Sequence, residues 1–228
     1  MPAGSSAERQ TARSLQAAET RQRLIEAAVQ HFSESNYDDV AVGDIAKSIG
    51  VAHGLLFHYF GNKHGIYLAA LRSAAQDLET SYNVATDLPA GQQVRAIYAA
   101  YLRYMSAHPG LGLRLILGGR GADPEAWTVF ETDRWHAIDK VATILGLDPS
   151  VRPLRLMLRA AAGAVDEATV QWLQHDEPFP VVKMVEAFVD MTAGGLRAAT
   201  RLDARVNVDA ALELLSQNPP QKRPRRRA

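Results

Sequence analysis

The chain has 228 residues, 47% of them hydrophobic, and its 25 basic and 25 acidic side chains give a formal net charge of zero. It contains no cysteine, which excludes a disulfide framework and any thiolate nucleophile or thiolate metal site. No segment approaches the roughly 20 apolar residues of a membrane span, and the first residues lack the apolar stretch of a secretory signal. These observations predict a soluble cytoplasmic protein with a sizeable core and no membrane partner.

The charges are spread unevenly along the chain. Residues 76–221 hold 13 basic and 18 acidic side chains, whereas residues 222–227 hold five basic and no acidic ones. Bulk charge therefore gives no support to a nucleic-acid partner, and such a function must depend on the local placement of groups.

Five expected segments begin within the first 70 residues. Residues 1–18 are polar and without apolar periodicity, which predicts a flexible N-terminal arm. Helical periodicity begins near Thr20, a candidate N-cap, and Leu24, Ala28 and Phe32 then form one apolar stripe.

Short helices are expected at about 42–49 and 52–59, with a turn at Gly50 between them. Asn62 is expected to cap a longer helix that runs to about residue 84.

The rest of the chain keeps helical periodicity between turns rich in proline and glycine. Helices are expected at about 91–107, 110–117, 124–146, 150–175, 181–200 and 207–217. Alternating strand patterns are absent. Residues 218–228 combine prolines with charges and are expected to be disordered. The predicted fold class is all-α.

Two short helices joined by a tight glycine-containing turn, after a longer supporting helix, are typical of a helix-turn-helix. In that motif the second short helix enters the major groove of DNA, which is wide enough for one helix. Three stretches carry the family resemblance: Asp44-Ile45-Ala46, Gly50-Val51, and Leu56-Phe57-His58-Tyr59-Phe60-Gly61-Asn62-Lys63. They resemble the DNA-binding signature of the TetR family of transcriptional regulators, and the resemblance covers about residues 20–70.

The resemblance implies a helix-turn-helix DNA-binding domain at 19–70 and a larger helical ligand-binding and dimerisation domain at 71–217. It also implies a homodimer on a palindromic operator in double-stranded DNA, a small-molecule effector, no enzymatic activity and no cofactor. The expected mechanism is repression relieved by a small apolar or amphipathic ligand, which favours a dimer spacing that no longer fits two half-sites about 34–36 Å apart.

The expected DNA contacts surround the second short helix. They are Ala41, Val42, Ala52, His53, Gly54, Leu55, Phe57, His58, Tyr59 and Lys63. Gly54 permits close approach to the groove floor, and Leu55 and Phe57 suit the thymine methyl group. Tyr59 and Lys63 suit phosphates.

Some of these positions depart from the family pattern. Ala41 and Ala52 stand where a serine or threonine commonly caps each short helix, and Leu55 and Phe57 replace a common threonine and tyrosine. Each change removes a hydroxyl group, so fewer polar contacts with DNA are expected.

The ligand is expected to lie among aromatic and apolar side chains of the larger domain. The candidate residues are Tyr101, Met105, Leu113, Leu117, Trp127, Phe130, Trp135 and Glu167. Helical spacing also fits an ordinary core for many of them. The pair Asp166-Glu167 could bind a cationic group or lie on an outer helix face.

Dimerisation is assigned to the helices at 150–175 and 181–200, whose many small and apolar residues would allow two copies to form a four-helix bundle. An intramolecular core is the other reading of that pattern.

Two rival functions are considered beside this one. The first is a helix-turn-helix regulator without a small-molecule effector, controlled by abundance or by a protein partner. The second is an enzyme, which no nucleophile motif or phosphate-binding loop supports. A metal site is not expected, because His53, His58 and His64 lack ligand spacing on one helix face. The basic tail could bind DNA without specificity or have no role.

Overall fold

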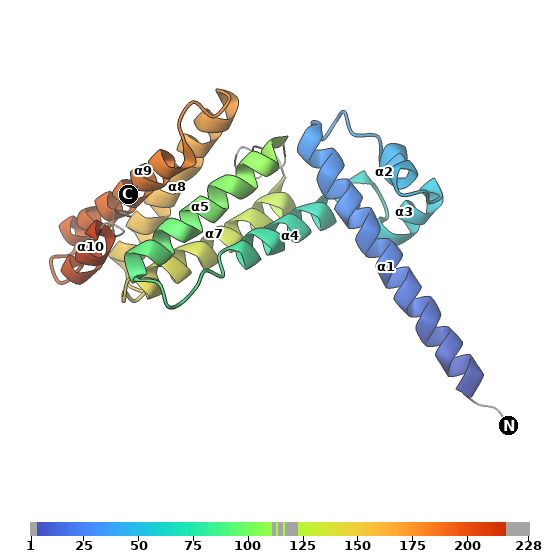
Figure 1. Ribbon diagram of the computed structural model, residues 1–228, viewed down its shortest axis with the longest axis horizontal. Coiled ribbons are helices and arrows are strands. Elements are labelled where there is room, and N and C mark those ends of the chain that lie inside the picture. Colours follow the sequence, from blue (N-terminus) through green and yellow to red (C-terminus); the bar gives the residue numbers. More distant parts are fainter. Residues whose placement is uncertain (1–3, 111–112, 114–115, 117–122, 218–228) are drawn as a thin grey trace, which may run out of the picture. The chain divides into compact units, whose positions relative to one another are not determined.

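The computed structural model describes residues 4–110, 113, 116 and 123–217, and all regular elements within those ranges are α-helices (Figure 1). The all-α prediction is thereby confirmed. None of the described helices is long and apolar enough to cross a membrane. The chain divides into two compact units, the first made of residues 1–76 and 108–130 and the second of 77–107 and 131–228.

The first unit contains α1 (Gly4–Glu34), α2 (Val42–Ser48), α3 (His53–Phe60) and most of α4 (Lys63–Ser81). The apolar stripe of α1 is fully buried, and Ile45 of α2 and Leu56 of α3 are buried with it. In Figure 1, α2 and α3 lie together against α1. A single small core therefore fixes the angle between the two short helices.

The expectation that the first helix begins near Thr20 is wrong, because α1 begins at Gly4. Residues 7–23 are rich in alanine, glutamine, glutamate and arginine, which favour helix even without an apolar stripe. Thr20 lies inside α1 and does not cap it. Its hydroxyl donates a hydrogen bond to the carbonyl oxygen of Gln16 (2.8 Å), the back-bonding that threonine adopts within helices.

The other helix ends follow the expected chemistry. The side-chain oxygen of Asn62 accepts a hydrogen bond from the amide of Gly65 (2.8 Å), which confirms the predicted cap of α4. Gly50 and Gly61 end α2 and α3 in the left-handed region, with φ of +71° and +76°. Neither of the alanines that precede α2 and α3 provides a side-chain cap.

The second unit is a helical bundle of α5 (Ala90–Ala107), α8 (Arg152–Gln174), α9 (Val181–Leu202) and α10 (Asp209–Ser216), with α7 (Pro124–Ile144) contributing from residue 131 onward. These bounds lie within three residues of the expected helices. The expected helix at 110–117 lies partly outside the described residues.

Close packing joins α8 to α9 along their length. A Cβ atom at Gly195 would lie 3.0 Å from the carbonyl oxygen of Met157 and 3.1 Å from the Cβ of Ala161. Arg95 of α5 makes two 2.9 Å hydrogen bonds with the carboxylate of Glu186 on α9 and a third, of 3.0 Å, with the carbonyl oxygen of Leu215 on α10. These contacts hold α5, α9 and α10 in one body.

Candidate functional site

The turn between α2 and α3 is fixed from the supporting helix. The guanidinium group of Arg23 on α1 donates a hydrogen bond to the carbonyl oxygen of Ile49 (3.0 Å), the residue at the C-terminal end of α2. Leu56 is the buried residue of α3, and it anchors that helix to the core. The opposite face of α3 is therefore presented outward.

None of the ten expected DNA-contacting residues is buried. His53, Gly54, Phe57 and His58 are exposed, and the Phe57 ring is unusual among them because an aromatic side chain is 42% exposed to solvent. The ring centroids of His53 and Phe57 lie 4.9 Å apart. An exposed surface of imidazoles and an aromatic ring on a short helix can make hydrogen bonds and apolar contacts with base edges.

Lys63, an expected phosphate contact, is engaged within the first unit. Its ammonium group donates a hydrogen bond to the carbonyl oxygen of Asp38 (3.1 Å) and lies 4.7 Å from the ring centroid of Tyr37. These contacts tie the start of α4 to the loop before α2. The ammonium group has three donors, so a phosphate contact would use a remaining one.

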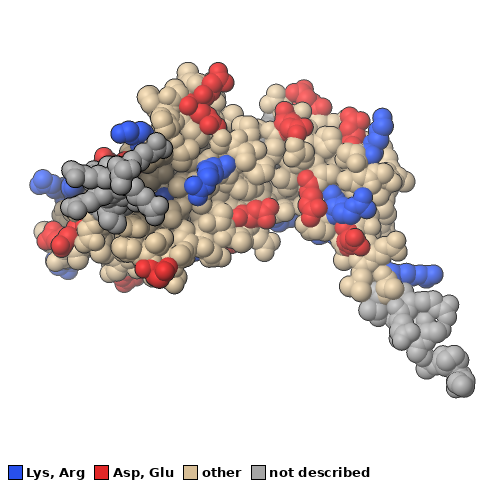
Figure 2. Space-filling model, viewed as in Figure 1, with Lys and Arg blue, Asp and Glu red and all other residues tan. Residues whose placement is uncertain are grey.

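On the face shown in Figure 2, the acidic and basic side chains of the described residues are interspersed among uncharged ones. This fits the zero net charge of the chain.

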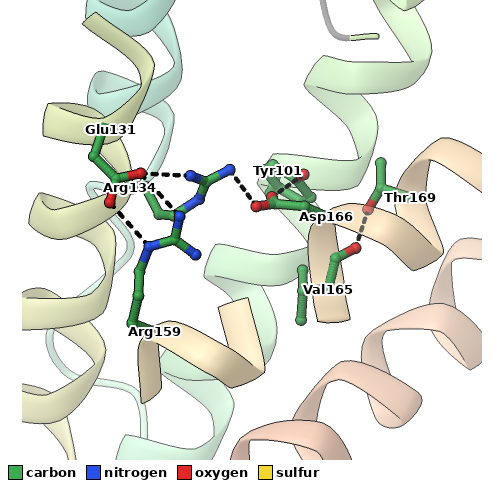
Figure 3. A network of polar contacts seen from close by, with 7 residues as sticks. All are labelled: Tyr101, Glu131, Arg134, Arg159, Val165, Asp166 and Thr169. Atoms are coloured by element: carbon green, nitrogen blue, oxygen red, sulfur yellow. Dashed lines mark hydrogen bonds and ion pairs between the residues drawn. The ribbon is translucent and has the colours of Figure 1, made fainter. Parts of the chain in front are cut away.

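The second unit contains a buried polar network that links α5, α7 and α8 (Figure 3). Arg159 makes hydrogen bonds of 3.0 and 2.9 Å to the two carboxylate oxygens of Glu131. Arg134 donates to Glu131 (2.7 Å) and forms an ion pair with Asp166, which also accepts a hydrogen bond from the hydroxyl of Tyr101 (3.1 Å). Two guanidinium groups thus balance two carboxylates.

The network alters the acidity of its carboxyl groups. Burial opposes ionisation of Glu131, but the hydrogen bonds and charges of Arg159 and Arg134 outweigh it and lower the pKa of Glu131. Burial raises the pKa of Asp166, against the opposing effects of Arg134 and Tyr101. The guanidinium group of Arg134 therefore stabilises the ionised form of the buried Asp166 carboxyl group.

Another buried carboxyl group lies outside this network. Asp133 on α7 is only 7% exposed. Burial, followed by the carboxylate of Glu79, raises the pKa of Asp133 to about 7. Burial also raises the pKa of four tyrosine hydroxyls in the same unit, so these are neutral phenols: Tyr82, Tyr98, Tyr101 and Tyr104.

Comparisons with known proteins were made for the whole chain. Residues 24–70 match the family described as bacterial regulatory proteins, tetR family. The chain therefore carries the DNA-binding domain of the TetR family. It is a DNA-binding transcriptional regulator and not an enzyme.

Relatives of this TetR-family regulator extend beyond the DNA-binding region. It is 27% identical to the HTH-type transcriptional activator FasR of Mycolicibacterium smegmatis over 184 residues, which are 78% of this chain and 83% of that protein. A tetR-family transcriptional regulator from Streptomyces coelicolor shares the fold, with a TM-score of 0.77, 23% identity and coverage of 90% and 91%. The regulator FadR from Bacillus subtilis, solved in complex with stearoyl-CoA, aligns with a TM-score of 0.57, 18% identity and coverage of 76% and 98%.

The predicted ligand-binding residues of this TetR-family regulator are divided between the two units. Tyr101 and Met105 are buried in the core of the second unit, and the partly buried Trp135 packs against that core. Trp127 and Phe130 belong to the first unit, where their rings meet edge to face at 6.2 Å.

The other three predicted ligand residues are Leu113, Leu117 and Glu167. Leu113 is partly buried in the first unit, and Leu117 lies outside the described residues. Glu167 is exposed on α8 and accepts a hydrogen bond from Gln171 (3.0 Å). The helix turns its neighbour Asp166 inward instead, and a ligand contact by Glu167 stays a prediction.

Sequence reasoning missed most of the buried polar groups of the TetR-family regulator. Asp133 and Arg134 occupy positions that align with the buried residues Ile138, Val141 and Leu145 on the core-facing side of α7. Two charged residues in line with the apolar residues of one helix are the sequence signal that could have identified these buried groups. The pairing of Glu131 with Arg159 could not be predicted, because the sequence does not show how α7 lies in register against α8.

Proposed function

We propose that this regulator binds a palindromic operator as a homodimer in the cytoplasm, through the outward face of α3, and that a small apolar or amphipathic molecule releases it. The observation that supports the DNA-binding half of the proposal is the exposed face formed by His53, Gly54, Phe57 and His58 beside buried Leu56. Flanking groups, including the backbone amides at the start of α4, would contact phosphates.

Exposed small and apolar residues on α8 and α9 support the dimer. On α8, Leu156 is 60% exposed, and Ala160 and Ala164 follow it at intervals of four on the same exposed side. On α9 the exposed side carries Ala187 and Gly194. Small residues allow close approach of two helix pairs, so a four-helix bundle between two copies would cover this surface.

Release by a ligand requires that the ligand bind two dimer conformations with different affinity. The helix α4 supplies residues to both units, so a change in the second unit can be passed to the first. In support of an amphipathic effector, the fold neighbour FadR from Bacillus subtilis was solved with stearoyl-CoA. Where the operator overlaps a promoter, binding represses the gene and release by the ligand relieves that repression. The relative FasR is named an activator, and the position of the operator relative to the promoter can set the sign of regulation.

The alternative is a regulator without a small-molecule effector, controlled by abundance or a protein partner. A second unit that binds no small molecule would favour it.

The DNA-binding proposal is tested by fluorescence anisotropy with the DNA flanking the gene, comparing the native chain with the double variant His53→Ala/His58→Ala. We expect at least a tenfold loss of affinity, because base-edge contacts contribute about 1–3 kcal/mol each. The matched control is His136→Ala/His175→Ala, which removes two exposed imidazoles from the second unit. Equal loss in both variants, or no saturable binding to flanking or randomly selected DNA, would contradict the proposal.

A further inference from the structure

The helix α3 lacks the side chains that most often read bases. Its residues, His53–Phe60, include no arginine, lysine, asparagine, glutamine, aspartate or glutamate, and no serine or threonine. Arginine or lysine on guanine, and asparagine or glutamine on adenine, are the common bidentate contacts in the major groove. The exposed polar side chains that α3 offers in their place are the imidazoles of His53 and His58. Recognition by α3 must therefore depend strongly on apolar contacts.

Phe57 is the apolar side chain of α3 that meets solvent. It is 42% exposed, and across residues 42–81, all of which the structure describes, no other large apolar side chain is exposed. Its neighbour Leu56 is fully buried, and the ring of Phe60 is partly covered, with the guanidinium group of Arg21 at 5.2 Å from its centroid. An aromatic ring left in water forfeits the free energy of burial. Core packing thus accounts for Leu56 but not for Phe57.

The ring of Phe57 is braced by the imidazole of His53. That imidazole lies close to the start of α2, because a Cβ atom at Gly43 would be 3.9 Å from its Cε1 and Nδ1 atoms. The ring centroids of His53 and Phe57 are 4.9 Å apart, with an interplanar angle of 42°. A Cβ atom at Gly54, one turn before Phe57, would meet nothing within 4 Å. The ring is therefore supported by a neighbour, and the helix surface next to it is open to a base edge.

The major groove offers one apolar group that fits such a ring. All base pairs present hydrogen-bond donors and acceptors there, and thymine alone adds a 5-methyl group. Phenylalanine is among the side chains that contact this methyl group. The imidazole of His53, next to the ring of Phe57, can donate or accept a hydrogen bond with the polar atoms of a base edge.

We propose that the Phe57 ring packs against the methyl group of one thymine in each operator half-site, and that Phe57 sets the preference for thymine at that position. This rests on the proposed function and deepens it by naming the base that α3 reads. Removing one buried methyl group corresponds to about a fourfold loss of affinity. Two half-sites related by symmetry would each lose one contact, so the loss for a whole operator is about 15-fold.

The experiment uses the full chain and the duplex that the native chain selects from random-sequence DNA. Each symmetry-related pair of thymines is replaced in turn by deoxyuridine, which lacks only the methyl group, and affinity is measured by fluorescence anisotropy at one salt concentration. For the native chain we expect one pair to lower affinity about 15-fold. Phe57→Ala should show no loss at that pair. The matched control is Phe179→Ala, which removes a phenylalanine 60% exposed in the second unit and should keep the native loss.

Folding of the Phe57→Ala protein is checked by circular dichroism, and the deoxyuridine series on the native chain needs no variant. Equal native affinity for every deoxyuridine duplex would overturn the methyl contact. An undiminished loss in Phe57→Ala would also overturn the proposal, because another residue would then contact the methyl group. Saturable binding in either case would leave the proposed function standing. If the native chain selected no duplex, the proposed function would fail together with this inference.

Discussion

Replacing Asp133 with asparagine should stabilise the protein in a pH-dependent way. The folded protein raises the pKa of Asp133 from 3.8 to about 7. In the unfolded chain this carboxyl group loses its proton near pH 4, whereas in the folded protein it keeps the proton until about pH 7. The folded state therefore binds more protons in this window, and its free energy of unfolding falls as pH rises from about 4 to 7.

The size of the effect follows from the shift in pKa. Each unit corresponds to about 1.4 kcal/mol, so the penalty of ionising buried Asp133 reaches about 4 kcal/mol above pH 7. Asparagine has no such ionisation and keeps nearly the same shape. We therefore expect Asp133→Asn to exceed the native protein in stability by up to about 4 kcal/mol at pH 8, with an advantage that disappears toward pH 4.

The assay is urea unfolding followed by circular dichroism at pH 4.5, 6 and 8, at a single protomer concentration because dimerisation adds to apparent stability. Subtracting the native curve from the variant curve cancels all other titrating groups. Asp139→Asn, which loses a partly exposed carboxylate, should give a flat difference between pH 6 and 8. A difference for Asp133→Asn that is flat, or that grows more unfavourable with rising pH, would refute the reasoning, because it would mean that the ionised carboxylate has a stabilising partner.

Two further substitutions test the buried network and the dimer surface. Arg134→Met should cost about 3–5 kcal/mol in urea unfolding, because it leaves the buried carboxylate of Asp166 without its cation; the double variant Arg134→Met/Asp166→Asn should recover part of this, and equal losses in both would contradict the ion-pair assignment. Leu156→Glu, on the exposed side of α8, should convert the dimer to monomer in sedimentation velocity, whereas Leu15→Glu, which replaces a leucine 66% exposed on α1, should not. A dimer that survives Leu156→Glu would place the interface elsewhere.

The DNA-binding region could be predicted closely because its signals are local. The glycine at position 50 and the cap at Asn62 act through neighbouring backbone atoms, and the structure places both as expected. The stripe of α1 likewise needs only helical spacing to identify Leu24, Ala28 and Phe32 as core. The start of the first helix could not be placed in the same way, because a polar sequence without an apolar stripe can still favour helix.

The interior of the second unit could not be predicted in the same way. The network of Glu131, Arg134, Arg159 and Asp166 depends on the register of α7 against α8, which no short-range pattern encodes. From the sequence, aromatic residues can be predicted as ligand contacts only by their residue type. The structure divides these residues between the two units. The raised pKa of Asp133 likewise depends on burial by helices that are distant in the sequence.

The central claim is that two copies of α3 read two half-sites on one face of DNA. Hydroxyl-radical footprinting of the full chain on operator DNA, selected by binding if necessary, tests this most directly. We predict two protected segments related by two-fold symmetry, with centres about 34–36 Å apart or a multiple of that distance, and their loss in the His53→Ala/His58→Ala variant. A single asymmetric segment, or protection that persists unchanged in that variant, would contradict the claim.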